Sequence, residues 1–246
     1  SHPHIEGFVV HELSTTASNF RSTLPLDQLF AKQKLTGIHR VDTRAITITL
    51  REKGALRGGI FPGEPDRNTM IAEVRTSPVL TGKDLVKKIS RKQPSWWNTE
   101  GTRTIAVIDC GVKHTILRML AAQGFKVIVV PAAYPPEEIV KIDPAGILVS
   151  NGPGDPAPLH YIAATVATLV ERFPIFGICL GHQILGMVFG GKTYKLKFGH
   201  HGANHPVRDL LTGKICITTQ NHGFCVDAES LRDPNIELTH LNLNDG

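Results

Sequence analysis

Short apolar segments alternate with helix-like segments between residues 104 and about 188, and this alternation constrains the fold more than any other feature. Strands buried on both faces of a sheet have continuous apolar sequences, and parallel strands need long crossovers, which are usually helices. We therefore predict an α/β fold with a mostly parallel sheet flanked by helices. The expected strands are residues 104–109, 126–130, 145–150 and 174–178, and the expected helices are residues 113–123, 137–141, 160–173 and a segment that begins near Leu180.

The first part of the chain has a different pattern, in which strand-like alternation and amphipathic segments follow each other less regularly. Strands are expected over Gly7–His11 and Ala45–Leu50, and helices over Leu26–Lys34 and Thr81–Arg91.

Residues 93–103 are aperiodic and rich in turn formers, which indicates a linker between two domains. The sequence thus predicts a smaller N-terminal α+β domain over residues 1–95 and the α/β domain over residues 103–246. Shorter β segments are expected over residues 213–240. Both ends lack the framework of a complete domain, so we expect the chain to be a piece of a longer protein.

Composition excludes several classes of protein. Hydrophobic residues make up 41% of the chain and charged residues 20%, which is typical of a packed core. No apolar run approaches the roughly 18 residues of a membrane span. The net charge of +5 is scattered, so we expect neither nucleic-acid nor membrane binding. The cysteines have no metal-ligand or redox spacing, which indicates reduced thiols in a cytosol-like compartment: Cys110, Cys179, Cys216 and Cys225.

The strongest local signal is the pentapeptide Gly177–Gly181, which follows a predicted buried strand and precedes a predicted helix. This is the nucleophile-elbow arrangement with cysteine in place of serine. The helix N-terminus should favour the thiolate of Cys179. A buried structural cysteine beside packing glycines is the alternative interpretation.

Two further segments strengthen the catalytic interpretation. Asn151–Pro156 (NGPGDP) follows the third predicted strand, and loops at the carboxyl ends of parallel strands share one rim where ligands bind. Glycine-rich backbone there can offer free N–H groups to an oxyanion, although an ordinary Gly-Pro turn would have the same sequence. Thr219–Phe224 adds amide, imidazole and backbone groups, with His222 interpreted as a structural histidine.

Taken in order, NGPGDP, FGICLGHQ, KFGHHGANHPV and TQNHGF resemble class I (triad) glutamine amidotransferase domains. The stretch KTYKLKFGHHGANHPV narrows this resemblance to the small subunits of carbamoyl phosphate synthetases. The first half is similar to the N-terminal domain of those subunits through ASNFRSTLPLDQLF and GIHRVDTRAITITLREKGALRGGI. The resemblance covers essentially the whole chain.

The resemblance implies a glutaminase subunit in which Cys179 attacks the carboxamide of L-glutamine, forms a γ-glutamyl thioester and releases ammonia. It implies an oxyanion hole formed by the backbone of Gly152 and the N–H of Leu180. The other glutamine contacts that it implies come from Gly154, Gln183, Asn221, Gly223 and Phe224.

The resemblance also implies a partner, the synthetase large subunit, in a heterodimer with this chain. The large subunit would use the ammonia with bicarbonate and with ATP and Mg to make carbamoyl phosphate for arginine and pyrimidine synthesis. This chain has no P-loop, so we expect no cofactor and no metal in it. The expected compartment is the cytoplasm, with the plastid as the alternative.

Two departures from the family affect the chemistry. The family's catalytic His and Glu lie in a His-Pro-Glu segment, which occurs nowhere in the 246 residues. A glutamine-contacting Ser of the family's early N-terminal region is also missing. Relatives that have lost glutaminase activity replace the elbow cysteine, so the presence of Cys179 predicts that the parent protein is active.

Three other functions are compatible with parts of this pattern. An amidotransferase of another synthase, such as those making GMP, anthranilate or CTP, is disfavoured by the N-terminal motifs. A catalytically silent regulatory protein is disfavoured by Cys179. A Cys-based α/β hydrolase is disfavoured by the GPGDP loop and by the lack of a suitable downstream acid and histidine.

Several other histidines are expected to have structural roles. His200, His201 and His205 are expected in a loop with diverging side chains rather than in a metal site, and His182 is expected to pack or to form a hydrogen bond.

Overall fold

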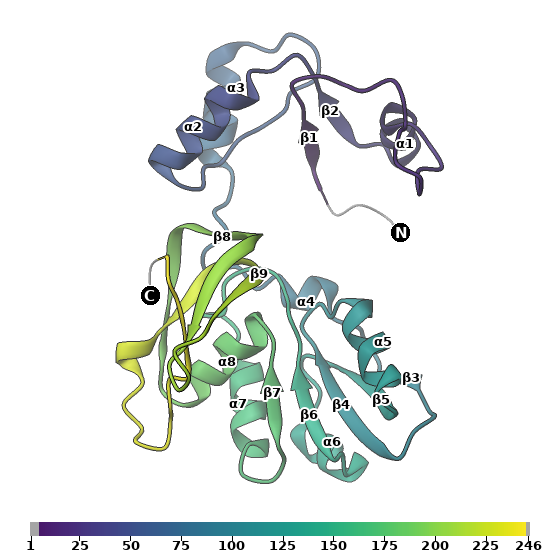
Figure 1. Ribbon diagram of the computed structural model, residues 1–246. Coiled ribbons are helices and arrows are strands. Elements are labelled where there is room, and N and C mark those ends of the chain that lie inside the picture. The colour runs from purple at the N-terminus through teal and green to yellow at the C-terminus, as the bar shows by residue number, and fades with distance from the viewer. Residues whose placement is uncertain (1–4, 245–246) are drawn as a thin grey trace. The chain divides into compact units, whose positions relative to one another are not determined.

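The computed structural model describes residues 5–244 and divides into two compact units, Ser1–Pro78 and Val79–Gly246 (Figure 1). In the first unit β1 pairs in parallel with β2, and three helices accompany this small sheet. Its elements are β1 (Gly7–Val9), α1 (Leu26–Gln33), β2 (Thr36–Ile38), α2 (Thr43–Lys53) and α3 (Arg67–Thr76).

Helix α2 contradicts the predicted strand over Ala45–Leu50. The side chain of Asp42 caps the helix by accepting a hydrogen bond of 2.9 Å from the backbone N–H of Ala45. At the other end, the backbone N–H of Gly54 donates to Leu50 O at 2.8 Å and completes the last turn. The hydroxyl of Thr47 donates to the carbonyl of Thr43, 2.8 Å away, one turn earlier. The strand prediction was wrong because these capping interactions outweigh the strand preference of alternating β-branched residues.

The second unit is built around a five-stranded sheet with the order β3-β5-β4-β6-β7. All neighbouring strands are parallel except β3, which pairs antiparallel to β5 at one edge. The elements up to the last strand of this sheet are α4 (Val86–Ile89), β3 (Ser95–Asn98), β4 (Arg103–Asp109), α5 (His114–Ala122), β5 (Phe125–Pro131), α6 (Pro136–Ile142), β6 (Gly146–Val149), α7 (His160–Leu169) and β7 (Ile175–Gly177). This architecture confirms the predicted mostly parallel sheet.

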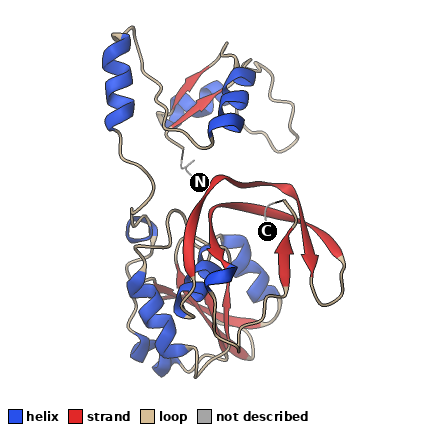
Figure 2. Cartoon of the chain, turned by 90° about the vertical axis from the view of Figure 1, so that its left-hand side faces the viewer, coloured by secondary structure: helices blue, strands red, loops and turns tan. Residues whose placement is uncertain are grey.

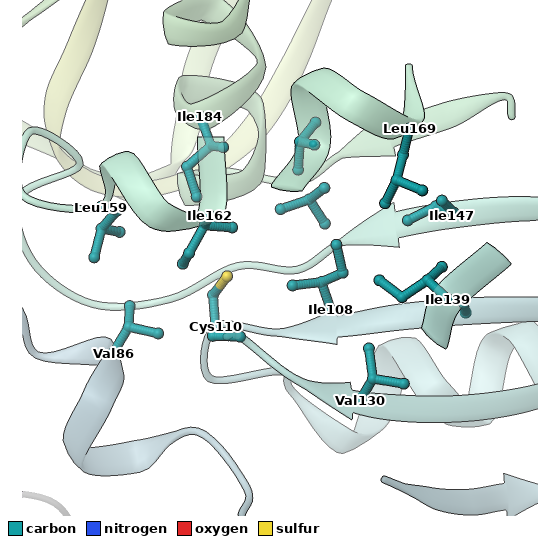
Figure 3. Packing of buried hydrophobic residues seen from close by; sticks show 14 of the residues in the cluster. Val86, Ile108, Cys110, Val130, Ile139, Ile147, Leu159, Ile162, Leu169 and Ile184 are labelled. Atoms are coloured by element: carbon teal, nitrogen blue, oxygen red, sulfur yellow. The ribbon is translucent and has the colours of Figure 1, made fainter. Parts of the chain in front are cut away.

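Helices cover both faces of this sheet, so its inner strands β4, β5 and β6 are buried on both sides, whereas the edge strands β3 and β7 are partly exposed. On one face Leu117 of α5 packs with buried valines of β4 and β5. On the other face Ile139 of α6, Ile162 of α7 and Ile184 of α8 form a larger cluster with the opposite side chains of the same strands (Figure 3). Helix α8 spans Leu180–Val188. Burial on both faces explains the continuous apolar sequence of the strands.

The segment before β4 is more structured than the sequence indicates. Residues 93–103, predicted as a linker, contain the edge strand β3, and the helix expected over Thr81–Arg91 is only the four residues of α4. The buried side chain of Val86 packs into the cluster of Figure 3, and Arg91 forms an ion pair of 3.2 Å with Asp109. Both contacts place this segment in the second unit, so the structural division falls earlier than the predicted linker.

A three-stranded antiparallel sheet with the order β10-β8-β9 completes the second unit, and Figure 2 shows its long, bent strands. Its elements are β8 (Lys192–Asp209), β9 (Ile215–Asp227), the 3-10 turn Ala228–Ser230 and β10 (His240–Asn242). The predicted loop around His200–His205 is therefore wrong, and β9 is longer than the short segments expected. Shifts in the β8–β9 register interrupt the regular alternation that would have indicated strands.

Within residues 5–244, none of the helices has the length and apolar character that crossing a membrane requires.

Candidate active site

Cys179 lies in a strained turn between β7 and α8. Its backbone has φ 53° and ψ −106°, in the region that favours glycine. The turn is tight because its glycines touch backbone: a Cβ on Gly181 would lie 2.0 Å from Val149 O, and one on Gly177 would lie 2.5 Å from the carbonyl carbon of Gly181. The predicted strained elbow is confirmed.

The loop after β6 lies against the elbow. A Cβ on Gly152 would be 2.6 Å from Leu180 Cδ2 and 2.2 Å from the backbone oxygen of Cys110. Asn151 ties this loop to the end of β4, because its amide donates to Gly111 O at 3.1 Å and its oxygen accepts from the N–H of Lys113 at 3.2 Å. The carboxyl ends of β4, β6 and β7 therefore meet beside Cys179.

Strand β9 reaches the same place from the second sheet. The thiol of Cys179 lies 3.8 Å from the backbone oxygen of Asn221. A further contact follows along the strand, since Gln183 Nε2 on α8 donates to Phe224 O at 2.7 Å. The structure thus brings together Cys179, Leu180, Gly152 and Asn221, as the prediction requires, and joins Gln183 to Phe224.

The other predicted glutamine contacts are Gly154, Gly223 and Phe224. Gly154 has φ 91° and faces Leu85, since a Cβ added at Gly154 would lie 3.4 Å from the Leu85 side chain. Gly223 has open space where a side chain would begin. The ring of Phe224 is buried in the protein at 4% exposure, so only its backbone could meet a ligand. Their roles in glutamine binding stay predictions.

Burial raises the pKa of the Cys179 thiol, and this effect is larger than the opposing effects of the Leu180 N–H and of the positive charge of Lys113. The expectation that the helix N-terminus favours the thiolate of Cys179 is therefore wrong for these residues. Desolvation of the half-buried sulfur opposes its charged form more than the Leu180 N–H and the charge of Lys113 favour it.

The remaining cysteines differ in exposure. Burial raises the pKa of Cys110 to about 12, and Figure 3 shows its sulfur pointing into the apolar cluster. Cys216 is exposed, whereas Cys225 is partly buried. Burial also lowers the pKa of His182, consistent with a packing residue rather than a charged one.

Sequence reasoning missed two side chains near the nucleophile. Lys113 follows β4 and acts electrostatically on Cys179, and the rule that strand ends share one rim would have indicated it. His201 Nδ1 lies 2.9 Å from Asn221 Oδ1 across the β8–β9 pair. No signal pointed to His201, because the strand β8 itself was not predicted.

Two of the three histidines of β8, His200 and His205, do not diverge. The rings of His200 and His205 lie 4.9 Å apart between centroids, and His200 and His222 lie 4.8 Å apart. Strand pairing gathers these rings on one face. Among the residues that the structure describes, no group of three or more His, Cys, Asp or Glu side chains is arranged to hold a metal ion.

Comparison with known proteins agrees with this site. The family model described as glutamine amidotransferase class-I matches residues 106–246, more than half of the chain. A Thermoplasma acidophilum protein described as part of a GMP synthase shares the fold, with a TM-score of 0.50 at 22% identity over 57% of this chain and 73% of its own. The fold and the elbow cysteine therefore define a class I glutamine amidotransferase domain.

The relatives in sequence are more specific. The carbamoyl phosphate synthase small chain of Solidesulfovibrio magneticus is 44% identical over 100% of this chain and 69% of its own length. The small chain of Ralstonia nicotianae is 46% identical over 99% of this chain and 68% of its own length. The chloroplastic small chain of Oryza sativa is 41% identical over 98% of this chain and 57% of its own length. The small-chain family model matches residues 1–60. The chain belongs to the carbamoyl-phosphate synthase small chain family and carries its glutamine amidotransferase domain.

Proposed function

We propose that Cys179 is the nucleophile that hydrolyses L-glutamine to glutamate and ammonia. One observation carries this assignment: a cysteine held at positive φ at a strand-to-helix turn, where the Gly152 loop and the Asn221 segment converge. A strained elbow with open backbone donors beside it is suited to a reaction that passes through an oxyanion.

In the proposed reaction a base accepts the thiol proton of Cys179 as the sulfur attacks the carboxamide carbon of glutamine, and the C=O electrons move onto oxygen. The N–H of Leu180 and the backbone of the Gly152 loop would stabilise that oxyanion. When the tetrahedral centre collapses, the C–N bond breaks and the nitrogen leaves as ammonia with a proton from the base. Water then attacks the γ-glutamyl thioester, which releases glutamate and restores the thiol.

The raised pKa of Cys179 explains why the reaction needs a base. The family resemblance implies a histidine and a glutamate from a His-Pro-Glu segment, which these 246 residues do not contain. Gln183, Asn221 and the backbone of Gly223 and Phe224 would hold the amino-acid end of glutamine. The aligned relatives extend beyond the matched region, since this chain covers 69% of the Solidesulfovibrio magneticus protein.

The ammonia would pass to a large subunit, the proposed partner in a heterodimer. That subunit would combine it with bicarbonate, using ATP with Mg, to form carbamoyl phosphate for arginine and pyrimidine synthesis. The proposed compartment is the cytoplasm, with the plastid as the alternative, since the Oryza sativa relative is chloroplastic. No cofactor is assigned to this chain.

Replacing Cys179 with serine tests the division of labour. Serine keeps the shape of the elbow, but its hydroxyl is a much weaker acid, so thioester chemistry should fall by orders of magnitude. The Cys179→Ser complex, built from the full-length small chain and its large partner, should make carbamoyl phosphate from ammonium salt and fail with glutamine. Loss of both reactions would contradict separate sites for making and using ammonia. Retention of both would show that Cys179 is not the nucleophile.

A further inference from the structure

The side chain of Gln220 is the centre of a hydrogen-bond network that links all three strands of the second sheet. Its Oε1 accepts a hydrogen bond from Asn242 Nδ2 on β10 at 3.1 Å, and it lies within hydrogen-bond distance of His200 Nδ1 on β8 at 2.8 Å and of His222 Nε2 on β9 at 3.1 Å. Polar groups from three strands thus converge on one oxygen.

The orientation of this amide is fixed from its other end. Gln220 Nε2 donates to Thr218 Oγ1 at 3.1 Å, and the hydroxyl of Thr218 in turn donates to the backbone oxygen of His205 at 2.9 Å. The oxygen of Gln220 must therefore face the three groups from β8, β9 and β10. His200 is only 6% exposed and Gln220 itself is half-buried, so an unsatisfied polar group at this side of the network is costly.

The network adjoins the proposed substrate segment on both sides. Gln220 immediately precedes Asn221, whose backbone oxygen lies 3.8 Å from the Cys179 sulfur. His222, which Gln220 holds through Nε2, reaches the backbone oxygen of Phe224 through Nδ1 at 2.9 Å. Gln220 is thus the shared anchor for the two ends of residues 221–224.

We propose that Gln220 is a positioning residue for glutamine binding, which fixes residues 221–224 against the Cys179 elbow by anchoring them to β8 and β10. This inference rests on the proposed glutaminase function. Gln220 acts through its neighbours, because its own oxygen and nitrogen are occupied by protein groups. Its effect falls on the binding of glutamine more than on the chemistry at sulfur.

The test compares Gln220→Leu with Gln220→Glu in the full-length protein. Leucine removes the acceptor, and KM for glutamine should rise about tenfold or more, with kcat within about threefold of the wild type. Glutamate keeps an oxygen facing the same three groups, and the Thr218 hydroxyl can turn to donate to its second oxygen in place of the lost Nε2 contact, so KM should return to within about threefold. Gln220→Asn, which is one methylene too short to reach all three groups, should resemble leucine and replaces it if leucine prevents folding.

Ser230→Ala is the matched control. Ser230 also joins β8 to β9, by accepting from Lys192 N at 2.7 Å and donating to Asp227 O, but it lies at the other end of the strand pair. Its loss should lower the unfolding temperature without changing KM. A purely structural role for Gln220 would give this pattern too, so unchanged KM in the leucine and asparagine variants would overturn the proposal.

A second readout follows from labelling of the thiol. Gln220→Leu should react with iodoacetamide at the wild-type rate, while a glutamine-like electrophile should need a higher concentration to saturate Cys179. Saturation of Cys179 at the same electrophile concentration in both proteins would also overturn the proposal.

The same assays distinguish failure of this inference from failure of the proposed function. If the wild type does not hydrolyse glutamine, the proposed function is wrong. If the wild type hydrolyses glutamine and the Gln220 variants have an unaltered KM, only this inference is wrong.

Discussion

Replacing Gly152 with alanine should disable the proposed oxyanion loop while leaving the fold in place. The new Cβ would lie 2.2 Å from the backbone oxygen of Cys110, and 2.6 Å from Leu180 Cδ2. Nonbonded carbon and oxygen atoms need more than about 3 Å, so the loop must move by roughly 1 Å, because a strand-end carbonyl cannot yield. A misplacement of about 1 Å at a reacting centre can cost roughly 100-fold in rate, and we expect kcat to fall by about that factor.

The assay is glutamate release by the full-length protein, measured over a range of glutamine concentrations together with the unfolding temperature. Gly146→Ala is the matched control on β6, the strand that precedes this loop, because its Cβ would meet its neighbours at an ordinary 3.4 and 3.5 Å. Gly146→Ala should keep the wild-type kcat. Wild-type kcat in a folded Gly152→Ala protein would refute the assignment of this loop to the oxyanion.

Other predictions concern the thiols and the first unit. A small alkylating reagent should label the exposed Cys216 before Cys179, and a glutamine-like electrophile should label Cys179 first. Peptide mapping would show the order of labelling, and the same order with both reagents would contradict a substrate pocket at Cys179. Because burial raises the pKa of Cys179, its alkylation rate should still increase with pH where the rate for an exposed thiol no longer changes. Lys113→Met removes a positive charge that favours the thiolate, so it should lower the alkylation rate of Cys179 further. An alkylation rate that does not depend on Lys113 would contradict the electrostatic contact. Asp42→Ala removes the cap of α2 and should lower the free energy of unfolding by about 1 kcal/mol in a denaturant titration, whereas an unchanged midpoint would show that the cap is not stabilising.

The parallel sheet and the elbow could be predicted because local sequence determines them. Strands β4, β5 and β6 are buried on both faces, so their sequences are continuous apolar runs. The glycines around Cys179 are required by contacts within a few residues or with the adjacent strand, and such a turn leaves a short motif.

The parts that could not be predicted depend on distant partners. Helix α2 carries a strand-like pattern, and its caps at Asp42 and Gly54 outweigh that pattern. Strand β8 contains glycines and histidines whose alternation is broken by register shifts, so only its pairing with β9 shows that it is a strand. The raised pKa of Cys179 depends on how deeply the folded chain covers the sulfur, which the motif does not specify.

The backbone of Cys179 has a consequence for how this chain can change. A non-glycine residue held at φ 53° carries a strain of the order of 1–3 kcal/mol, which the rest of the domain must outweigh. Glycine at the same place would relieve that strain, so Cys179→Gly should unfold at a higher temperature than the wild type while losing the nucleophile. The most stable version of this sequence is therefore not the catalytic one. In a relative that no longer needs to hydrolyse glutamine, substitutions that relieve the strain at this turn would raise stability without a cost to function. We therefore expect selection for ammonia release to be what retains a cysteine at this strained position.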